Sequence, residues 1–140
     1  MSRVPRPCLV DTNVAIVANG KSEQADEELV EKCIDAILEI TMKGGLVIDS
    51  EDRIFDEYRQ NLSLSGQPGT GDAFMKWVHD FRWQTELCER RDVTCLDEDE
   101  QVFKEFPDES ALRDFDRSDR KFVAVANAGK PRPILQAVDF

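Results

Sequence analysis

Acidic residues follow three short apolar runs of this 140-residue chain, at the point where each run ends. These residues are Asp11, Asp49 and Asp139; Glu57 lies in the segment after the second run, and Asp119 precedes an alanine-rich segment. Each acid by itself is explained by capping a helix or by solvation at the surface. Carboxylates gathered at one place, however, repel one another and raise each other's pKa unless a cation neutralises them. Oxygen-only ligands suit Mg²⁺ or Mn²⁺, so the combination predicts a divalent-cation site.

Other kinds of catalytic or binding site have little support in the sequence. The single histidine, His79, stands in a helical pattern beside Trp77 and Phe81, so we expect a packing or surface role rather than a catalytic base. The four cysteines form no close pair, which argues against a zinc site and for reduced, buried thiols. The Gly-rich segment 63–71 lacks the Gly-Lys-Ser/Thr ending and the preceding strand of a phosphate-binding loop.

The hydrophobic pattern predicts the elements that position these acids. After an irregular lead over residues 1–7, short apolar runs predict strands, and 3.6-residue periodicity predicts helices. We expect strands over 8–12, 46–48, 92–96 and 134–138, helices over 24–42, 51–63, 72–88 and 122–128, and short exposed helical pieces over the acidic stretch 97–119. The alternation of strands and helices predicts an α/β fold with a mainly parallel sheet covered on both faces. In such sheets ligands bind beyond the carboxyl ends of the strands, where the acids stand.

Length and composition favour one domain over residues 1–140, with 41% hydrophobic residues. No stretch approaches the roughly 20 apolar residues of a membrane span, and the first residues lack the apolar core of a signal peptide. We therefore expect a cytoplasmic protein without membrane contact. The net charge of −11 argues against nonspecific nucleic-acid binding through a basic surface, but it suits a protein that gathers carboxylates around cations.

Four segments of the chain resemble the four motifs of a PIN domain, in the order that the family has them. They are Val10–Asn13, Phe55–Tyr58, Asp116–Ala126 and Pro133–Asp139. Together they extend over essentially the whole chain. The resemblance implies a three-layer α/β/α sandwich with a mainly parallel central sheet and an acidic pocket that binds Mg²⁺ or Mn²⁺.

The resemblance also assigns roles to residues of this chain. The catalytic and metal-binding acids would be Asp11, Glu57, Asp119 and Asp139. Asp116 would either share the third role or cap the helix. Asn13 would orient a ligand or water in the pocket, and Asp49 is a further pocket candidate because it ends a strand. The cations expected to contact substrate are Arg117, Arg120, Lys121 and Arg132.

Many members of this family are ribonucleases. The resemblance therefore implies that this chain is a metal-dependent ribonuclease, which would act on single-stranded or structured RNA through metal-activated water. The toxin of a toxin–antitoxin pair is one form that such an enzyme takes. We accordingly expect RNA as a partner, with a protein antitoxin and a homodimer as further expectations. The alternative is a catalytically weak interaction module, whose acidic segment 97–119 binds a basic partner or covers the pocket. A phosphohydrolase of the haloacid-dehalogenase type is disfavoured because Asp11-Thr12-Asn13 lacks the second Asp of that pattern.

Overall fold

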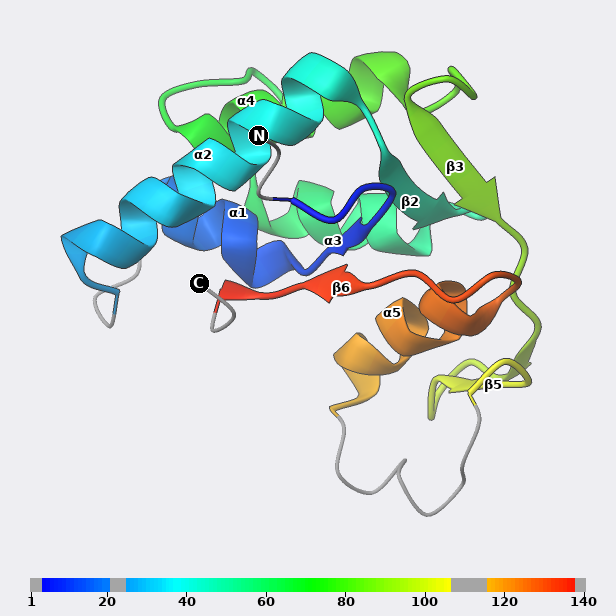
Figure 1. The fold of residues 1–140 in the computed structure, drawn as a ribbon. Coiled ribbons are helices and arrows are strands. Elements are labelled where there is room, and N and C mark those ends of the chain that lie inside the picture. Colours follow the sequence, from blue (N-terminus) through cyan, green and yellow to red (C-terminus); the bar gives the residue numbers. More distant parts are fainter. Residues whose placement is uncertain (1–3, 21–24, 107–115, 138–140) are drawn as a thin grey trace.

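The computed structural model describes residues 4–20, 25–106 and 116–137, and it is a mixed structure of helices and short strands (Figure 1). This agrees with the predicted α/β class. In chain order the elements are β1 (Leu9–Val10), α1 (Thr12–Ala18), α2 (Glu27–Lys43), β2 (Leu46–Asp49), α3 (Arg53–Asn61), α4 (Thr70–Phe81), β3 (Cys88–Arg91), β4 (Cys95–Asp97), β5 (Val102–Phe103), α5 (Arg117–Asn127) and β6 (Ile134–Leu135). No helix among the described residues combines the length and the apolar composition needed to cross a membrane.

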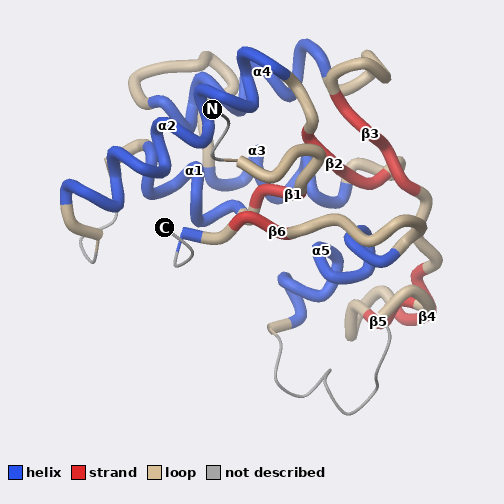
Figure 2. The backbone as a smooth tube through the Cα atoms, in the orientation of Figure 1, coloured by secondary structure: helices blue, strands red, loops and turns tan. Residues whose placement is uncertain are grey.

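Four of the strands run parallel. β1 pairs with β6, so that Leu9 lies opposite Ile134, and β2 pairs with β3. An isolated parallel bridge between Cys8 and Leu46 joins the two pairs, which places the strands in the order β6, β1, β2, β3. β4 and β5 instead form a separate antiparallel hairpin, which lies beside α5 (Figure 2). The first and last described strands therefore lie next to each other, and their carboxyl ends share one edge.

Helices α1, α2 and α4 pack against one another, whereas α5 contacts β2, β5, β6 and α3. The core between these elements is aliphatic and aromatic, and Tyr58, Phe74 and Phe122 are its largest fully buried side chains. Tyr58 meets Phe74 edge to face at 5.3 Å between ring centroids, and its hydroxyl donates to the carbonyl of Val10 at 2.5 Å. Because an aromatic hydroxyl buried without a partner costs free energy, this bond fixes α3 against the end of β1.

A glycine sets how closely α4 approaches α1. A Cβ atom added at Gly71 would lie 2.0 Å from the carbonyl oxygen of Ala15, a distance that no side chain tolerates. Nearby, the buried carboxylate of Asp72 accepts from the backbone N–H of Gly69 at 3.1 Å and from the Asn19 amide at 3.1 Å. The start of α4 is thereby anchored to Asn19, the residue that caps the carboxyl end of α1.

The first predicted strand is shorter than expected, and a helix follows it that the sequence did not indicate. Only Leu9 and Val10 are in β1; Asp11 is the N-cap of α1, and its carboxylate accepts from the backbone N–H of Asn13 at 3.2 Å. Thr12–Ala18 has no polar stripe because both sides of this short helix are largely buried. A continuous apolar segment of this kind cannot be assigned to strand or helix by periodicity.

The predicted strand over 92–96 is confirmed only at residues 95 and 96, which begin β4, and this strand belongs to the antiparallel hairpin instead of the parallel sheet. The strand that pairs with β2 is Cys88–Arg91, which lies between the predicted helix over 72–88 and the predicted strand over 92–96, and α4 already ends at Phe81. The sequence Cys-Glu-Arg-Arg of β3 contains no apolar run that would predict a strand. Arg91 is nevertheless buried, because its guanidinium donates hydrogen bonds to backbone carbonyls. Cys95 belongs to the hairpin, which lies where helical pieces were expected over residues 97–106. Residues 107–115 lie outside the described residues, and residues 117–119 are helical as the start of α5.

The remaining elements agree with the predictions more closely. β2 has all four residues buried, as expected of a strand covered on both faces. α2 is capped by Asp26, whose carboxylate accepts from the backbone N–H of Leu29, and α5 begins at Arg117, ahead of the predicted start. Cys8, Cys33 and Cys88 are buried free thiols, as predicted, whereas Cys95 is partly exposed.

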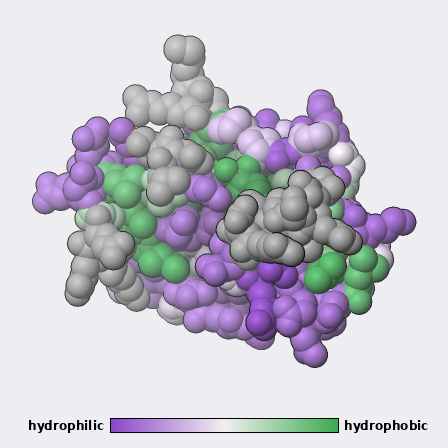
Figure 3. All heavy atoms as spheres, turned by 90° about the horizontal axis from the view of Figure 1, so that it is seen from below, coloured by the Kyte–Doolittle hydropathy of each residue, from purple (hydrophilic) through white to green (hydrophobic). Residues whose placement is uncertain are grey.

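The surface is mainly hydrophilic on the face shown in Figure 3, where hydrophobic side chains form separate groups. The large exposed apolar residues come from α2, the loop after α3, the turn after α4, and β4; they are Leu38, Met42, Leu64, Trp83 and Leu96. His79 is also exposed and pairs with Asp80 at 3.1 Å, in agreement with a surface role.

Candidate acidic site

Three carboxylates from three different elements lie near enough to one another to interact electrostatically. Asp11 is the N-cap of α1, Glu57 lies on α3, and Asp119 lies in the first turn of α5. Burial raises the pKa of Asp11, and the negative charges of Asp119 and Glu57 raise it further, although the backbone N–H of Asn13 and the Lys121 ammonium oppose the change. Burial likewise raises the pKa of Asp119, with additional contributions from Glu57 and Asp116. The structure thus brings these three predicted acids together.

Lys121 places a positive charge inside this group. Its Nζ lies 2.6 Å from Glu57 Oε1 and donates to the carbonyl of Ser118, also at 2.6 Å. Both partners are largely buried, with side chains 9% and 16% exposed for Lys121 and Glu57. The other oxygen of Glu57 accepts from the hydroxyl of Thr12. The sequence assigned Lys121 to substrate contact; the structure shows that it neutralises a site carboxylate.

The carboxyl end of β6 reaches the same region through Asn13. The amide oxygen of Asn13 accepts from the backbone N–H of Ala137 at 3.3 Å. Asn13 therefore links α1 to the segment that leads to Asp139, which itself lies outside the described residues. The role of Asn13 as a pocket residue stays a prediction, and its side chain makes a structural contact at the edge of the site.

Asp49, which was predicted to be a pocket residue, binds the backbone at the start of α3. It is fully buried, and its two carboxylate oxygens accept from the backbone N–H groups of Arg53 and Ile54, each at 2.9 Å. These are donors of the first turn of α3, which lack partners within the helix. The residue at the N-cap position, Asp52, makes no such bond. Asp49 therefore caps α3 from the end of β2 and fixes the helix that carries Glu57.

The other predicted cations have acidic or carbonyl partners. Arg117 Nε lies 3.5 Å from a carboxylate oxygen of Glu100, and Arg120 donates to the Glu100 carbonyl at 2.6 Å. Arg132 Nη2 lies 3.4 Å from Oε1 of Glu89, which belongs to β3. The acid Asp116 occupies the N-cap position of α5 without a side-chain bond to the helix. Sequence reasoning did not identify Thr12, and its position directly after Asp11 was the only available signal.

The donor set is compatible with a hard divalent cation. Its side-chain oxygens come from Asp11, Glu57 and Asp119, and the pKa values of both aspartates are raised, first by burial and then by the negative charge of the neighbouring acids. Mg²⁺ and Mn²⁺ prefer such oxygen ligands. Within the described ranges, however, no three acidic, histidine or cysteine side chains stand close enough together to hold a metal ion. Binding would require rearrangement of these side chains, including displacement of Lys121 from Glu57.

Comparison of the chain with protein-family models, with curated proteins and with solved structures found no match. The site is therefore interpreted from its own chemistry and from the sequence motifs that led to it.

Proposed function

We propose that the protein is a Mg²⁺- or Mn²⁺-dependent ribonuclease with a PIN-like three-layer α/β/α architecture. The observation that carries this proposal is the convergence of Asp11, Glu57 and Asp119 from α1, α3 and α5, with the pKa of both aspartates raised. Such a group of carboxylates is unfavourable for the metal-free fold. It is expected where a cation site has been retained.

In this proposal the residues of the site have distinct tasks. Asp11, Glu57 and Asp119 would hold the cation, with Asp139 as a further ligand expected from the sequence. A bound divalent cation would lower the pKa of a water molecule and stabilise the negative charge that develops at a phosphodiester. Thr12 orients the Glu57 carboxylate through its hydroxyl, and Asp49 fixes the helix beneath it.

The test is cleavage of a labelled single-stranded RNA with Mn²⁺, Mg²⁺ or EDTA. We expect cleavage only with a divalent metal, and Asp11→Asn and Asp119→Asn should each lower it by about 100-fold or more, since metal stabilisation amounts to several kcal/mol. Asp35→Asn is the matched control because Asp35 is an exposed acid on α2, away from the site. Equal cleavage by wild type and Asp11→Asn would indicate a contaminating nuclease, and absence of metal-dependent cleavage would contradict the proposal.

The interaction module is the second candidate function. It is favoured by the Lys121 ammonium, which already occupies a position against Glu57 that a metal would need. The two candidates differ in their response to metal, because a retained cation site should raise the melting temperature of the protein. If millimolar Mn²⁺ raises the melting temperature of wild type but not of Asp11→Asn, the ribonuclease proposal is supported. If neither variant responds and no RNA is cleaved, the interaction module becomes the better description.

The toxin role, an antitoxin partner, a homodimer and a cytoplasmic location remain predictions from the sequence. Co-expression with a candidate antitoxin would test the first two of these, and the mass of the protein in solution would test the third.

A further inference from the structure

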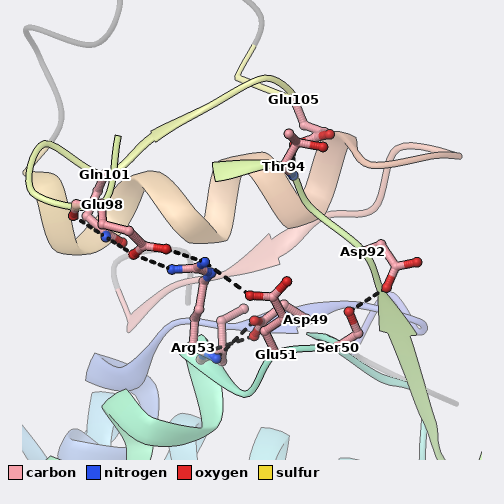
Figure 4. Close-up of polar contacts among 10 residues, drawn as sticks. Asp49, Ser50, Glu51, Arg53, Asp92, Thr94, Glu98, Gln101 and Glu105 are labelled. Atoms are coloured by element: carbon pink, nitrogen blue, oxygen red, sulfur yellow. Dashed lines mark hydrogen bonds and ion pairs between the residues drawn. The ribbon is translucent and has the colours of Figure 1, made fainter. Parts of the chain in front are cut away.

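The tip of the β4–β5 hairpin contacts α3 through an arginine. The carboxylate of Glu98 accepts from both terminal nitrogens of Arg53, at 2.8 Å from Nη1 and 2.6 Å from Nη2 (Figure 4). A guanidinium that binds two oxygens side by side has the geometry with which arginine recognises both carboxylates and phosphates. Glu51 adds a contact to Arg53 at 3.2 Å, and the guanidinium also lies over the Phe103 ring at 5.5 Å.

The same hairpin tip contacts α5 through two further arginines. The backbone carbonyl of Glu100 accepts from Arg120 at 2.6 Å, and the Glu100 carboxylate lies 3.5 Å from Arg117. Three arginines from two helices thus meet one acidic segment, Asp97–Glu100. These are the helices that carry Glu57 and Asp119.

We infer that Arg53, Arg117 and Arg120, here called the arginine surface, bind the phosphate backbone of an RNA strand, and that Glu98 and Glu100 occupy this surface until RNA displaces them. This inference rests on the proposed function and extends it to how the substrate is recognised.

The position of the arginine surface supports this inference. Arg53 precedes Glu57 by four residues on α3, so the two side chains lie on neighbouring turns of the same helix face. On α5, Asp119 lies between Arg117 and Arg120 in the sequence. A strand whose phosphates contact these arginines therefore passes next to the acidic site. Local cations at this position would also allow an acidic chain of net charge −11 to approach RNA.

The exchange between carboxylates and phosphates is energetically feasible. The side chains of Glu98 and Glu100 are 64% and 53% exposed, so both carboxylates can leave the arginines for solvent when a phosphate takes their place. The hydrogen bonds from Arg53 lower the pKa of Glu98 to about 2, so Glu98 is ionised and competes with phosphate at every pH near neutrality. Neutralising these two glutamates should therefore increase RNA affinity by removing the competitor.

The experiment compares wild type with Glu98→Gln/Glu100→Gln by titrating each into a fluorescent 20-nucleotide single-stranded RNA in EDTA, at several salt concentrations. The control is Glu31→Gln/Asp35→Asn, which changes the net charge equally at two exposed positions of α2. We expect the hairpin variant to bind roughly 10-fold more tightly than the control. Its plot of log affinity against log salt should be steeper by about 1.4, the value for two added phosphate contacts with a single strand. Adding Arg117→Gln to the hairpin variant should reverse part of this gain.

Equal affinities for the hairpin variant and the control, or no RNA binding by either one, would overturn the inference. Hydrogen exchange of wild-type protein gives a measurement that needs no variant: RNA should increase exchange at the backbone amides of 98–101, and unchanged or slower exchange there would count against displacement. Because binding is measured without metal, its outcome is independent of cleavage. Metal-dependent cleavage by wild type without a hairpin effect would refute only this inference, whereas a hairpin effect without any cleavage would refute only the ribonuclease proposal.

Discussion

The ammonium of Lys121 lies 2.6 Å from Glu57 Oε1, so the acidic site contains a cation that the chain itself supplies. Lys121 follows Asp119 by two residues on α5, and the carbonyl of Ser118 holds the same ammonium. This pair explains how three carboxylates remain close together in a metal-free fold. It also means that a divalent cation must compete with the lysine for Glu57.

Replacing Lys121 by Met should destabilise the metal-free protein and strengthen its response to metal. Removal of one partner leaves a mostly buried carboxylate without its counter-ion, which should lower the free energy of unfolding by about 2–3 kcal/mol. Urea unfolding in EDTA measures this loss, and repeating it with Mn²⁺ should recover more stability in the variant than in wild type. Lys130→Met, an exposed position with the same change of charge, is the control. If both variants unfold at the same urea concentration, Lys121 does not stabilise the acidic site.

Replacing Asp11 by Asn should stabilise the metal-free protein at neutral pH. The pKa of Asp11 is raised above its ordinary value of 3.8, so the folded state keeps this proton to a higher pH than the unfolded chain does. Stability therefore falls as pH rises from 3.8 through the raised pKa, and it stays lower above that pH. Asn removes this loss and still caps α1, since Asn and Asp are equivalent N-caps.

The contrast with Asp11→Ala separates the charge from the cap. Alanine also removes the unfavourable charge, but it loses the bond to the Asn13 N–H and should be about 1 kcal/mol less stable than the Asn variant. Thermal unfolding at pH 4 and pH 7 tests both statements. The explanation fails if Asp11→Asn has no greater advantage over wild type at pH 7 than at pH 4.

Arg91→Lys should be strongly destabilising although both residues are positively charged. The Arg91 guanidinium donates to the carbonyls of Val125, Ala126 and Lys130, and it closes the carboxyl end of α5. A lysine ammonium cannot reach all three, so we expect a loss of about 2–4 kcal/mol in the free energy of unfolding. Arg59→Lys, on the exposed side of α3, should change it by less than about 0.5 kcal/mol. A small effect at both positions would contradict the assigned role of Arg91.

Three thiols should resist alkylation until the protein unfolds. Burial raises the pKa of Cys8 to about 12 and those of Cys33 and Cys88 to about 11, so almost no thiolate is present at pH 8. Cys95 is partly exposed and should react first with iodoacetamide, which peptide mass spectrometry can follow. Because Glu98 contributes to the raised pKa of Cys95, Glu98→Gln should speed this reaction. Early labelling of Cys8 would show that the strand pairs open more readily than their burial implies.

The sequence predicted those elements whose burial pattern is regular. β2 is a plain aliphatic run, and α2 shows a stripe in which Cys33, Ile37 and Ile40 are buried. α1 was missed because both sides of this short helix are covered. β3 was missed because Arg91 is buried for its hydrogen bonds and not for its hydrophobicity.

The proximity of three predicted acids could be expected from the sequence, but their contacts with other residues could not. The acids were identified by their positions after strands and near helix starts, and Asp11, Glu57 and Asp119 do come together. The pairing of Glu57 with Lys121 joins residues 64 positions apart, and it depends on side-chain directions that no local pattern encodes. The capping role of Asp49 was hidden for a similar reason, because it depends on the direction of a carboxylate at the end of β2 toward the first turn of α3.

The pairing of β1 with β6 also has a consequence for when the site can form during translation. Leu9 and Val10 meet Ile134 and Leu135, and Asn13 binds the backbone of Ala137. During synthesis on a ribosome, β1 therefore cannot pair with β6 until residues 134–137 have been made. Residues 46–91 can form the pair of β2 and β3 before that point. A nascent chain that stops before residue 134 lacks β6 beside β1, so the contact between Asn13 and Ala137 at the edge of the acidic site forms only after residue 137 has been made.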